Sequence, residues 1–333
     1  MRIALTGSIA TDHLMRFPGT FAEQLLPDQL HRISLSFLVD DLVVRNGGVA
    51  ANIAHGLGRL GERPLLIGAV GRDFAGYRAE LESHGVDTSF VHVSDVAHTA
   101  RFVCTTDTEL CQIASFYPGA MSEARQIALA PVAERFGGLD MVVVSPNDPD
   151  AMIRHTQECR ERGYPFAADP SQQLARMAGA DAKQLIDGAA YLFCNDYEKN
   201  LLESKTGWSS DDVLARVAVR VTTHGADGVV IEAKDAEPIR VPVMPARIIG
   251  DPTGVGDAFR AGFFAGLAWE LDHQQAARVG CLLATLSLET MAPQDYEMSN
   301  DESIKRLAEA YGTDAAMEIA PHLPSVPGDS SDA

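Results

Sequence analysis

Short apolar runs alternate with longer amphipathic segments through most of the chain. The runs are typical of strands buried on both faces of a parallel sheet, and they lie at residues 2–9, 64–70, 141–145, 165–168, 191–194 and 220–223. Between them, apolar residues recur at helical spacing over 49–60, 74–84, 150–162, 197–205 and 211–217. Strand and helix repeated in this order predict an α/β fold with a doubly wound, mostly parallel sheet flanked by helices.

Two segments depart from this rhythm. Residues 33–44 and 99–117 alternate apolar and polar side chains, as half-exposed strands do, and the second indicates a hairpin that turns near Asp107 and Thr108. We predict a small β-sheet lid, with strands inserted from about 11–44 and 99–117 into a single domain over 1–320. The last third is predicted to be mostly helical, over 255–271, 273–289 and 301–311. Residues 322–333, rich in Pro, Gly, Ser and Asp, are predicted to form a disordered tail.

The charge balance narrows the classes of partner. The 333 residues carry 27 Lys and Arg against 46 Asp and Glu, and this net charge of −19 repels nucleic-acid phosphates and anionic lipids. No apolar run reaches the roughly 18 to 20 residues of a membrane-spanning helix. Five scattered cysteines without a C-x-x-C pair argue against a zinc site or a disulfide framework and favour a cytoplasmic location. We therefore predict no nucleic-acid partner and no membrane partner.

Two patterns that could suggest function have ordinary structural explanations. Gly56, Gly58 and Gly61 match G-x-G-x-x-G, but they end a predicted helix and lead into a strand, the reverse of the order that dinucleotide binding requires. We interpret Gly61 as a helix C-cap and the other two as close-packing positions. Cys104 and Cys111 are symmetric about the predicted hairpin turn and could face each other in a redox-sensitive lid. Packing as small apolar side chains is the default for both.

The segment Asp251-Pro-Thr-Gly-Val-Gly-Asp-Ala-Phe259 is the strongest chemical signal in the chain. It follows an extended stretch and opens an apolar helix. Glycines let the backbone approach a ligand closely, and free N–H groups at a helix N-terminus bind an anion without any lysine. Asp257 in that turn would suit a general base. On these residues alone, a capped turn in which the helix dipole stabilises Asp257 is an equal alternative.

Four motifs in the same order resemble those of the ribokinase (PfkB-like) kinase family, over about residues 1–315. They are the D-x-T-G-x-G-D-x-F segment above, Gly47-Gly48 followed by Asn52, the N-x-x-E pair of Asn195 and Glu198, and Thr223-His-Gly225-Ala-Asp-Gly228. Within the family the chain is most similar to the adenosine kinases of actinobacteria. It departs from the broader family at Asp169-Pro-Ser171, where Asp-Pro-Asn is common, and the neighbouring Gln172 and Gln173 agree with the members that use nucleosides.

The resemblance implies an ATP-dependent adenosine kinase of purine salvage. Asp257 would then be the base that takes the proton of the 5′-hydroxyl, and the anion hole would be formed by the N–H groups of Gly254, Val255 and Gly256. The ATP site would be lined by Asn195, Thr223, Gly225, Gly228 and Gly256. Glu198 would hold Mg²⁺ through water. Many members of the family also use a monovalent cation such as K⁺, and nothing in the sequence identifies its site.

The resemblance also assigns the nucleoside contacts. Asp12 would accept hydrogen bonds from the two ribose hydroxyls, Gly48 would let the backbone approach the sugar, and Asn52 could add an amide contact. The polar base contacts would come from Ser8, Ser36, Gln172 and Gln173, and the stacking contacts from Phe102 and Phe116. Without the resemblance, packing within the lid explains the two rings equally well, and a surface amide explains Asn52.

The same residues leave two rival functions to consider, and they predict an oligomeric state. A sugar kinase of the ribokinase or fructokinase type would share the fold and Asp257. A non-catalytic nucleoside-binding protein is disfavoured because the base and the anion hole are both intact. The apolar lid strands are too few to bury both of their faces, so we predict a homodimer through the lid, with a monomer as the alternative.

Overall fold

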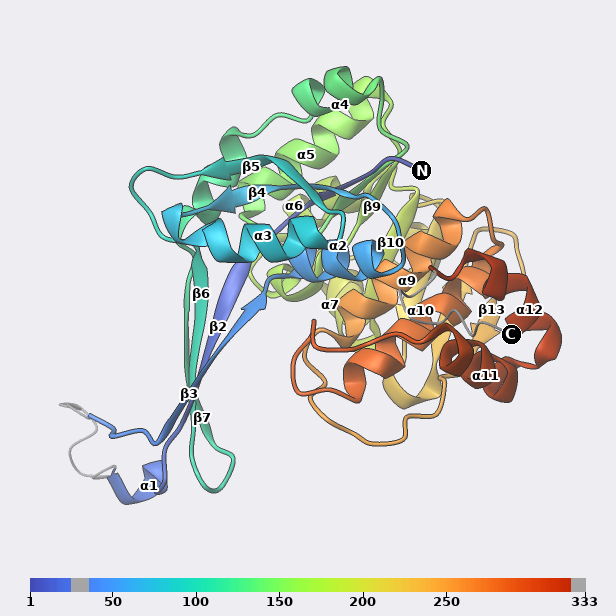
Figure 1. The fold of residues 1–333 in the computed structure, drawn as a ribbon. Coiled ribbons are helices and arrows are strands. Elements are labelled where there is room, and N and C mark those ends of the chain that lie inside the picture. Colours follow the sequence, from blue (N-terminus) through green and yellow to red (C-terminus); the bar gives the residue numbers. More distant parts are fainter. Residues whose placement is uncertain (25–35, 325–333) are drawn as a thin grey trace.

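The computed structural model describes residues 1–24 and 36–324. Within these residues, nine strands form one central sheet (Figure 1). The strand order is β13-β12-β11-β10-β9-β8-β1-β4-β5, and every neighbouring pair from β11 to β5 is parallel. The strands are β1 (Ile3–Thr6), β4 (Leu65–Val70), β5 (Asp87–Val93), β8 (Met141–Val144), β9 (Phe166–Ala168), β10 (Tyr191–Asn195), β11 (Val219–Thr223), β12 (Val229–Glu232) and β13 (Ile239–Val241). The predicted doubly wound, mostly parallel sheet is confirmed.

Helices cover both faces of this sheet. One face is covered by α2 (Val49–Arg59), α3 (Ala75–Ser83), α9 (Val255–Ala268) and α10 (His273–Leu288). The other face is covered by α4 (Ala130–Phe136), α5 (Pro149–Arg162), α6 (Gly179–Ile186), α7 (Asp196–Thr206) and α8 (Ser210–Leu214). The chain then continues through α11 (Asn300–Tyr311) and α12 (Thr313–Ile319), which pack against α10.

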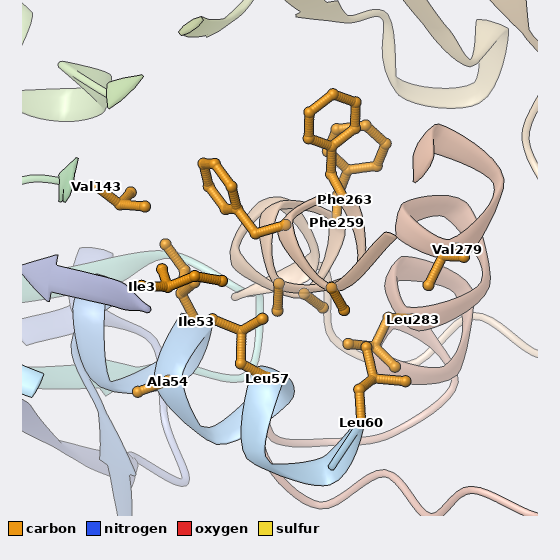
Figure 2. Close-up of a cluster of buried hydrophobic side chains, with 14 of the residues drawn as sticks. Ile3, Ile53, Ala54, Leu57, Leu60, Val143, Phe259, Phe263, Val279 and Leu283 are labelled. Carbon is orange, nitrogen blue, oxygen red and sulfur yellow. The ribbon is translucent and has the colours of Figure 1, made fainter. Parts of the chain in front are cut away.

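The core is built by side chains that alternate between the two faces of each strand. Ile3 and Leu5 of β1 join the cluster under α2, α9 and α10, whereas Ala4 joins the cluster on the opposite face. Figure 2 shows the first cluster, in which Leu57 of α2 and Phe259 of α9 lie in the same apolar interior. Gly56 permits this close packing, because a Cβ there would lie 2.6 Å from Ala261 Cβ. This packing fixes α9, and with it Asp257, against α2.

The second sheet is the predicted lid. Its order is β3-β2-β6-β7, with β2 (Ala10–Arg16), β3 (Asp41–Gly47), β6 (Ala100–Thr106) and β7 (Gln112–Tyr117). These strands project away from the body of the molecule, and a short helix, α1 (Phe21–Gln24), lies near their far end (Figure 1). The hairpin turns where predicted, since Asp107 Oδ1 accepts hydrogen bonds from the Glu109 and Cys111 N–H groups.

Three expectations need correction or fall outside the described residues. The strand expected over 33–44 begins only at Asp41; residues 36–40 are not in a strand, and 33–35 lie outside the described part. The first residues of the predicted disordered tail are ordered, since His322 stacks on Trp269 and Leu323 is buried; the rest of the predicted tail, 325–333, lies outside the described residues. Cys104 pairs with Ala114 rather than facing Cys111, so the register does not support a disulfide across the hairpin. Among the described helices, none is both long and apolar enough to span a membrane.

Candidate active site

The N-terminus of α9 forms the centre of the candidate site. The backbone turns at Gly254, whose φ of 79° is left-handed, and a Cβ there would lie 2.3 Å from Pro293 Cβ. Val255 and Gly256 begin the helix, where N–H groups lack intrahelical acceptors; the Val255 N–H reaches only the Pro252 carbonyl, at 3.3 Å. The turn therefore offers backbone donors and the positive end of a helix dipole to an anion, as the predicted anion hole requires.

Asp257 lies on the first turn of α9 and is partly buried. Its Oδ2 accepts a hydrogen bond from Asn52 Nδ2 at 2.9 Å, which joins α9 to α2. Burial raises the pKa of Asp257 to about 6, against the lowering effects of the Arg260 charge and of the Asn52 hydrogen bond. Such a carboxylate is ionised at neutral pH and is a stronger base than a surface aspartate, so it suits proton abstraction from an alcohol.

Arg260, which the sequence analysis did not select, lies beneath the anion hole. Its Nη1 is 2.8 Å from the position that a Cβ on Gly256 would occupy, and its Nη2 donates to Asp169 Oδ1 at 2.6 Å. Both side chains of this ion pair are buried, and burial raises the pKa of Asp169 to about 7. The pair holds a fixed positive charge next to Asp257, and that charge favours the ionised base.

The lid register brings four side chains into one row across the sheet. Asp12 of β2 is paired with Arg45 of β3 and with Phe102 of β6, and Phe102 is paired with Phe116 of β7. Residues paired in this way point to the same face of a sheet. The row therefore combines the predicted diol ligand with both predicted stacking rings, and it adds Arg45, which was not predicted.

Asp12 and Arg45 of this row lie near the start of α9. Burial raises the pKa of Asp12 to about 6; the charge of Arg45 lowers that pKa, and the negative charges of Asp251 and Asp257 raise it further. These couplings require that the Asp12 carboxylate lies near the anion-hole turn. Arg45 reaches the same turn, with its Nη1 3.9 Å from Asp251 Oδ2. The lid and the start of α9 thus lie next to each other, with the predicted diol acceptor on the lid and the predicted base on α9.

Gly48 and Ser8 hold the root of the lid against the sheet. Gly48 has a φ of 95°, and a Cβ there would lie 2.6 Å from the Ser8 carbonyl oxygen. Ser8 Oγ accepts a hydrogen bond from the Val49 N–H at 3.0 Å, at the start of α2. The close approach that requires a glycine at position 48 is thus to the chain's own backbone, and the contact of Gly48 with a sugar stays a prediction.

The predicted ATP-binding residues follow two neighbouring strands. Asn195 ends β10 and caps α7: its Oδ1 accepts from the Glu198 N–H, and its own N–H donates to Glu198 Oε2. Thr223 ends the adjacent strand β11, and the glycines at 225 and 228 both have positive φ in the turn that follows. The carboxyl ends of adjacent parallel strands are where nucleotides bind in sheets of this kind. These residues are therefore gathered at one edge of the sheet.

The described residues contain no group of three or more His, Cys, Asp and Glu that could hold a metal ion. Glu198, largely buried, is the predicted Mg²⁺ ligand, and it raises the pKa of both Asp257 and Asp169. Mg²⁺ is commonly held by one or two carboxylates together with water and substrate phosphates. The surroundings of Glu198 fit an ion that arrives with a nucleotide rather than one held by the protein alone.

Three predicted base contacts have no described link to the lid row. Ser36 is exposed and precedes β3. Gln172 and Gln173 lie in a 3-10 helix, Ser171–Ala175, shortly after Asp169, and Gln172 Oε1 accepts from Ser171 Oγ at 2.6 Å. Their contact with a base stays a prediction.

Comparison with known proteins identifies the family. The model of the pfkB family of carbohydrate kinases matches residues 12–299, which include the lid, the α9 turn and the β10 and β11 ends. The chain belongs to the pfkB family of carbohydrate kinases. A nucleoside kinase of Methanothermobacter thermautotrophicus is 31% identical over 80% of this chain and 86% of its own. A second, from Methanocaldococcus jannaschii, is 28% identical over 78% of this chain and 85% of its own.

A solved relative agrees in structure over almost the whole chain. The nucleoside kinase of Burkholderia thailandensis in complex with inosine has a TM-score of 0.81 and 34% identity, covering 93% of this chain and 98% of its own. Other relatives include a Bacillus subtilis ribokinase, 27% identical over 73% of this chain and 80% of its own. A Saccharomyces cerevisiae adenosine kinase is 24% identical over 74% of this chain and 78% of its own. The kinase chemistry predicted from Asp257 and the glycine turn is therefore the chemistry of the family.

Proposed function

We propose that this protein is a nucleoside kinase that transfers the γ-phosphate of ATP to the 5′-hydroxyl of adenosine, giving AMP and ADP. The observation that carries the proposal is the cross-strand row of Asp12, Phe102 and Phe116, in which Asp12 lies near Asp257. A carboxylate suits a vicinal diol because the hydrogen bonds are charge-assisted, and flat rings suit a base. The nucleoside kinases among its relatives support the same substrate class.

The mechanism follows from these positions. Asp12 would hold the ribose hydroxyls and so present the 5′-hydroxyl to Asp257, which takes its proton as the oxygen attacks phosphorus. The N–H groups at the start of α9 would stabilise the negative charge of the transferring phosphoryl group, and Arg260 beneath them would support the ionised form of Asp257. Mg²⁺ bound with ATP and held near Glu198 through water would neutralise the phosphate charge. The reaction takes place in the cytoplasm in this proposal, since ATP is the phosphate donor.

A sugar kinase is the second candidate, because a ribokinase is among the relatives and Asp12 would bind free ribose equally well. The two rings decide between the candidates. Ribose leaves Phe102 and Phe116 without a stacking partner, and Phe116 is 41% exposed in the open lid. A panel of adenosine, inosine, guanosine, cytidine, ribose and fructose, each with MgATP and read as ADP release, separates them and identifies the preferred base. The same panel with and without K⁺ tests the monovalent-cation requirement.

We also propose that two copies pack through the outer face of the lid, on the side opposite Asp12. The register places two further cross-strand rows there, Leu42–Met15–Thr105–Ile113 and Asn46–Thr11–Arg101–Tyr117. Leu42, Ile113 and Tyr117 are 55%, 46% and 44% exposed, as is Val44 at 54% in the row between them. An apolar face of this kind is typical of an interface.

A further inference from the structure

A chain of buried and partly buried hydrogen bonds leads from the root of the lid to Asp257. The Tyr77 hydroxyl of α3 donates to the carbonyl oxygen of Gly47, the last residue of lid strand β3, at 3.1 Å. Gln294 Nε2 donates both to the Tyr77 oxygen, at 2.6 Å, and to Asn52 Oδ1, at 2.8 Å. Asn52 Nδ2 then donates to Asp257 Oδ2 at 2.9 Å. Four segments of the chain thus meet in one hydrogen-bond network; they carry Gly47 and Asn52, Tyr77, Asp257, and Gln294.

The Gly47 carbonyl sets the direction of every hydrogen bond in this network. A carbonyl oxygen can only accept a hydrogen bond, so the Tyr77 hydroxyl donates its single proton to Gly47. The Tyr77 oxygen must therefore accept from Gln294. Burial raises the pKa of Tyr77, which keeps that proton in place. The NH₂ group of Gln294 therefore faces inward, Asn52 must turn its oxygen toward it, and the Asn52 NH₂ group is left to face Asp257.

The loop that carries Gln294 also borders the anion hole. Pro293, its neighbour, is the residue against which the turn at Gly254 packs. Gln294 Oε1 is buried and has no hydrogen-bond partner among the described residues. Burying an amide with one unsatisfied acceptor lowers stability. The two hydrogen bonds that the Gln294 nitrogen donates offset that cost.

We propose that Gln294 is a positioning residue for phosphoryl transfer, which with Tyr77 fixes the Asn52 amide so that its N–H group, and not its oxygen, faces Asp257. The inference rests on the proposed function only in taking Asp257 as the base. An Asn52 oxygen turned toward Asp257 would repel the ionised carboxylate and favour its protonated form, which cannot accept a proton.

The test compares Gln294→Leu, Tyr77→Phe and the double variant with the native enzyme. Gln294→Leu removes both donors at similar volume, and Tyr77→Phe removes only the hydroxyl. Asp295→Asn is the matched control, because Asp295 is the exposed neighbour of Gln294 on the same loop. All are assayed on whichever substrate the native enzyme phosphorylates best, so a preference for a sugar would contradict the nucleoside proposal without affecting this comparison.

Gln294→Leu should lower kcat by about 10- to 100-fold, as small displacements of a reacting group do, and change KM for both substrates by less than about 3-fold. Asp295→Asn should match the native enzyme. Because Tyr77 orients the Asn52 amide through Gln294, the double variant should have about the same kcat as Gln294→Leu alone. A native kcat in Gln294→Leu would overturn the proposal. So would a fold-loss of kcat in the double variant equal to the product of the fold-losses in the two single variants.

The pH profile supplies a readout that a purely structural role would not change. Four charged groups also influence Asp257, namely Arg260 on the same helix α9, Glu198 on α7, Asp12 on β2 and Asp169 after β9, and these stay in place in the variant. Loss of the fixed Asn52 donor should therefore move the acidic limb of kcat to higher pH in Gln294→Leu. An acidic limb that stays at the native pH would contradict the assigned role of Gln294.

Discussion

At the scale of single residues, Asp257 combines three influences that a lone aspartate lacks. It has the N–H groups of α9 beside it, the charge of Arg260 one turn away, and the Asn52 amide bonded to its Oδ2. Asp257→Asn keeps the shape but cannot accept a proton, so kcat should fall by about 10² to 10⁴. Nucleoside binding, measured by calorimetry, should change far less because Asp12 holds the ribose. Near-native kcat in Asp257→Asn would show that another group is the base.

The pKa values of Asp257 and Asp12 give a second residue-scale prediction. Burial raises both pKa values to about 6, and in the proposed mechanism both groups act as carboxylates, Asp257 as the base and Asp12 as the diol acceptor. Since acid protonates them, kcat/KM for the nucleoside should fall as the pH drops below about 6, with a log–log slope approaching about 2. In Asp12→Asn, the slope of the remaining activity should fall to about 1, because only Asp257 then titrates. A flat profile between pH 5 and 8 would be incompatible with this assignment.

Single residues also show what the sequence could and could not predict. Asp257 and its glycines lie within one short motif, so their role could be predicted from neighbours in the chain. Arg260 and Gln294 act through Asp169 and Asn52, which are 91 and 242 residues away, and no local pattern marks such pairs.

At the scale of elements, the same distinction between local and distant contacts holds. The six predicted core strands are all present, because burial on both faces requires continuous apolar runs. The two edge strands, β5 and β13, and β12, which lies next to β13, were missed because their sequences mix polar and apolar residues. The lid strands β6 and β7 were predicted from their alternation and β3 only in part, and β2 was not predicted as a separate strand. Their shared row was not, because it depends on a parallel pairing between β2 and β6.

That row yields a prediction for β6. Phe102 lies on the face of Asp12, and Val103, the next residue, lies on the opposite face of the same strand. Loss of a stacking ring costs about 1 to 3 kcal/mol of base binding, so Phe102→Ala should raise KM for adenosine by about 5- to 150-fold. Val103→Ala is the matched control and should leave that KM near its native value. Equal KM values in the two variants would remove Phe102 from the base site.

At the scale of the whole molecule, the lid projects away from the body (Figure 1), and Asp12 and Arg45 lie on the lid face that borders the candidate site. If the outer face joins two copies, sedimentation at micromolar concentration should give about 71 kDa, twice the chain mass of 35.7 kDa. Val44→Asp, in the middle of that face, should produce monomers, because an unpaired buried charge is costly. Val93→Asp, at an exposed position on β5, should remain dimeric. A fully active native species near 36 kDa would contradict the dimer.

The central claim is that the lid row recognises a nucleoside and Asp257 phosphorylates it. The most direct test is a competition in which adenosine and ribose are offered together with limiting MgATP and the phosphorylated products are quantified by mass spectrometry. Because the ratio of products reports the ratio of kcat/KM, stacking on Phe102 and Phe116 predicts AMP in large excess over ribose 5-phosphate. Equal amounts of the two products, or an excess of ribose 5-phosphate, would contradict the account.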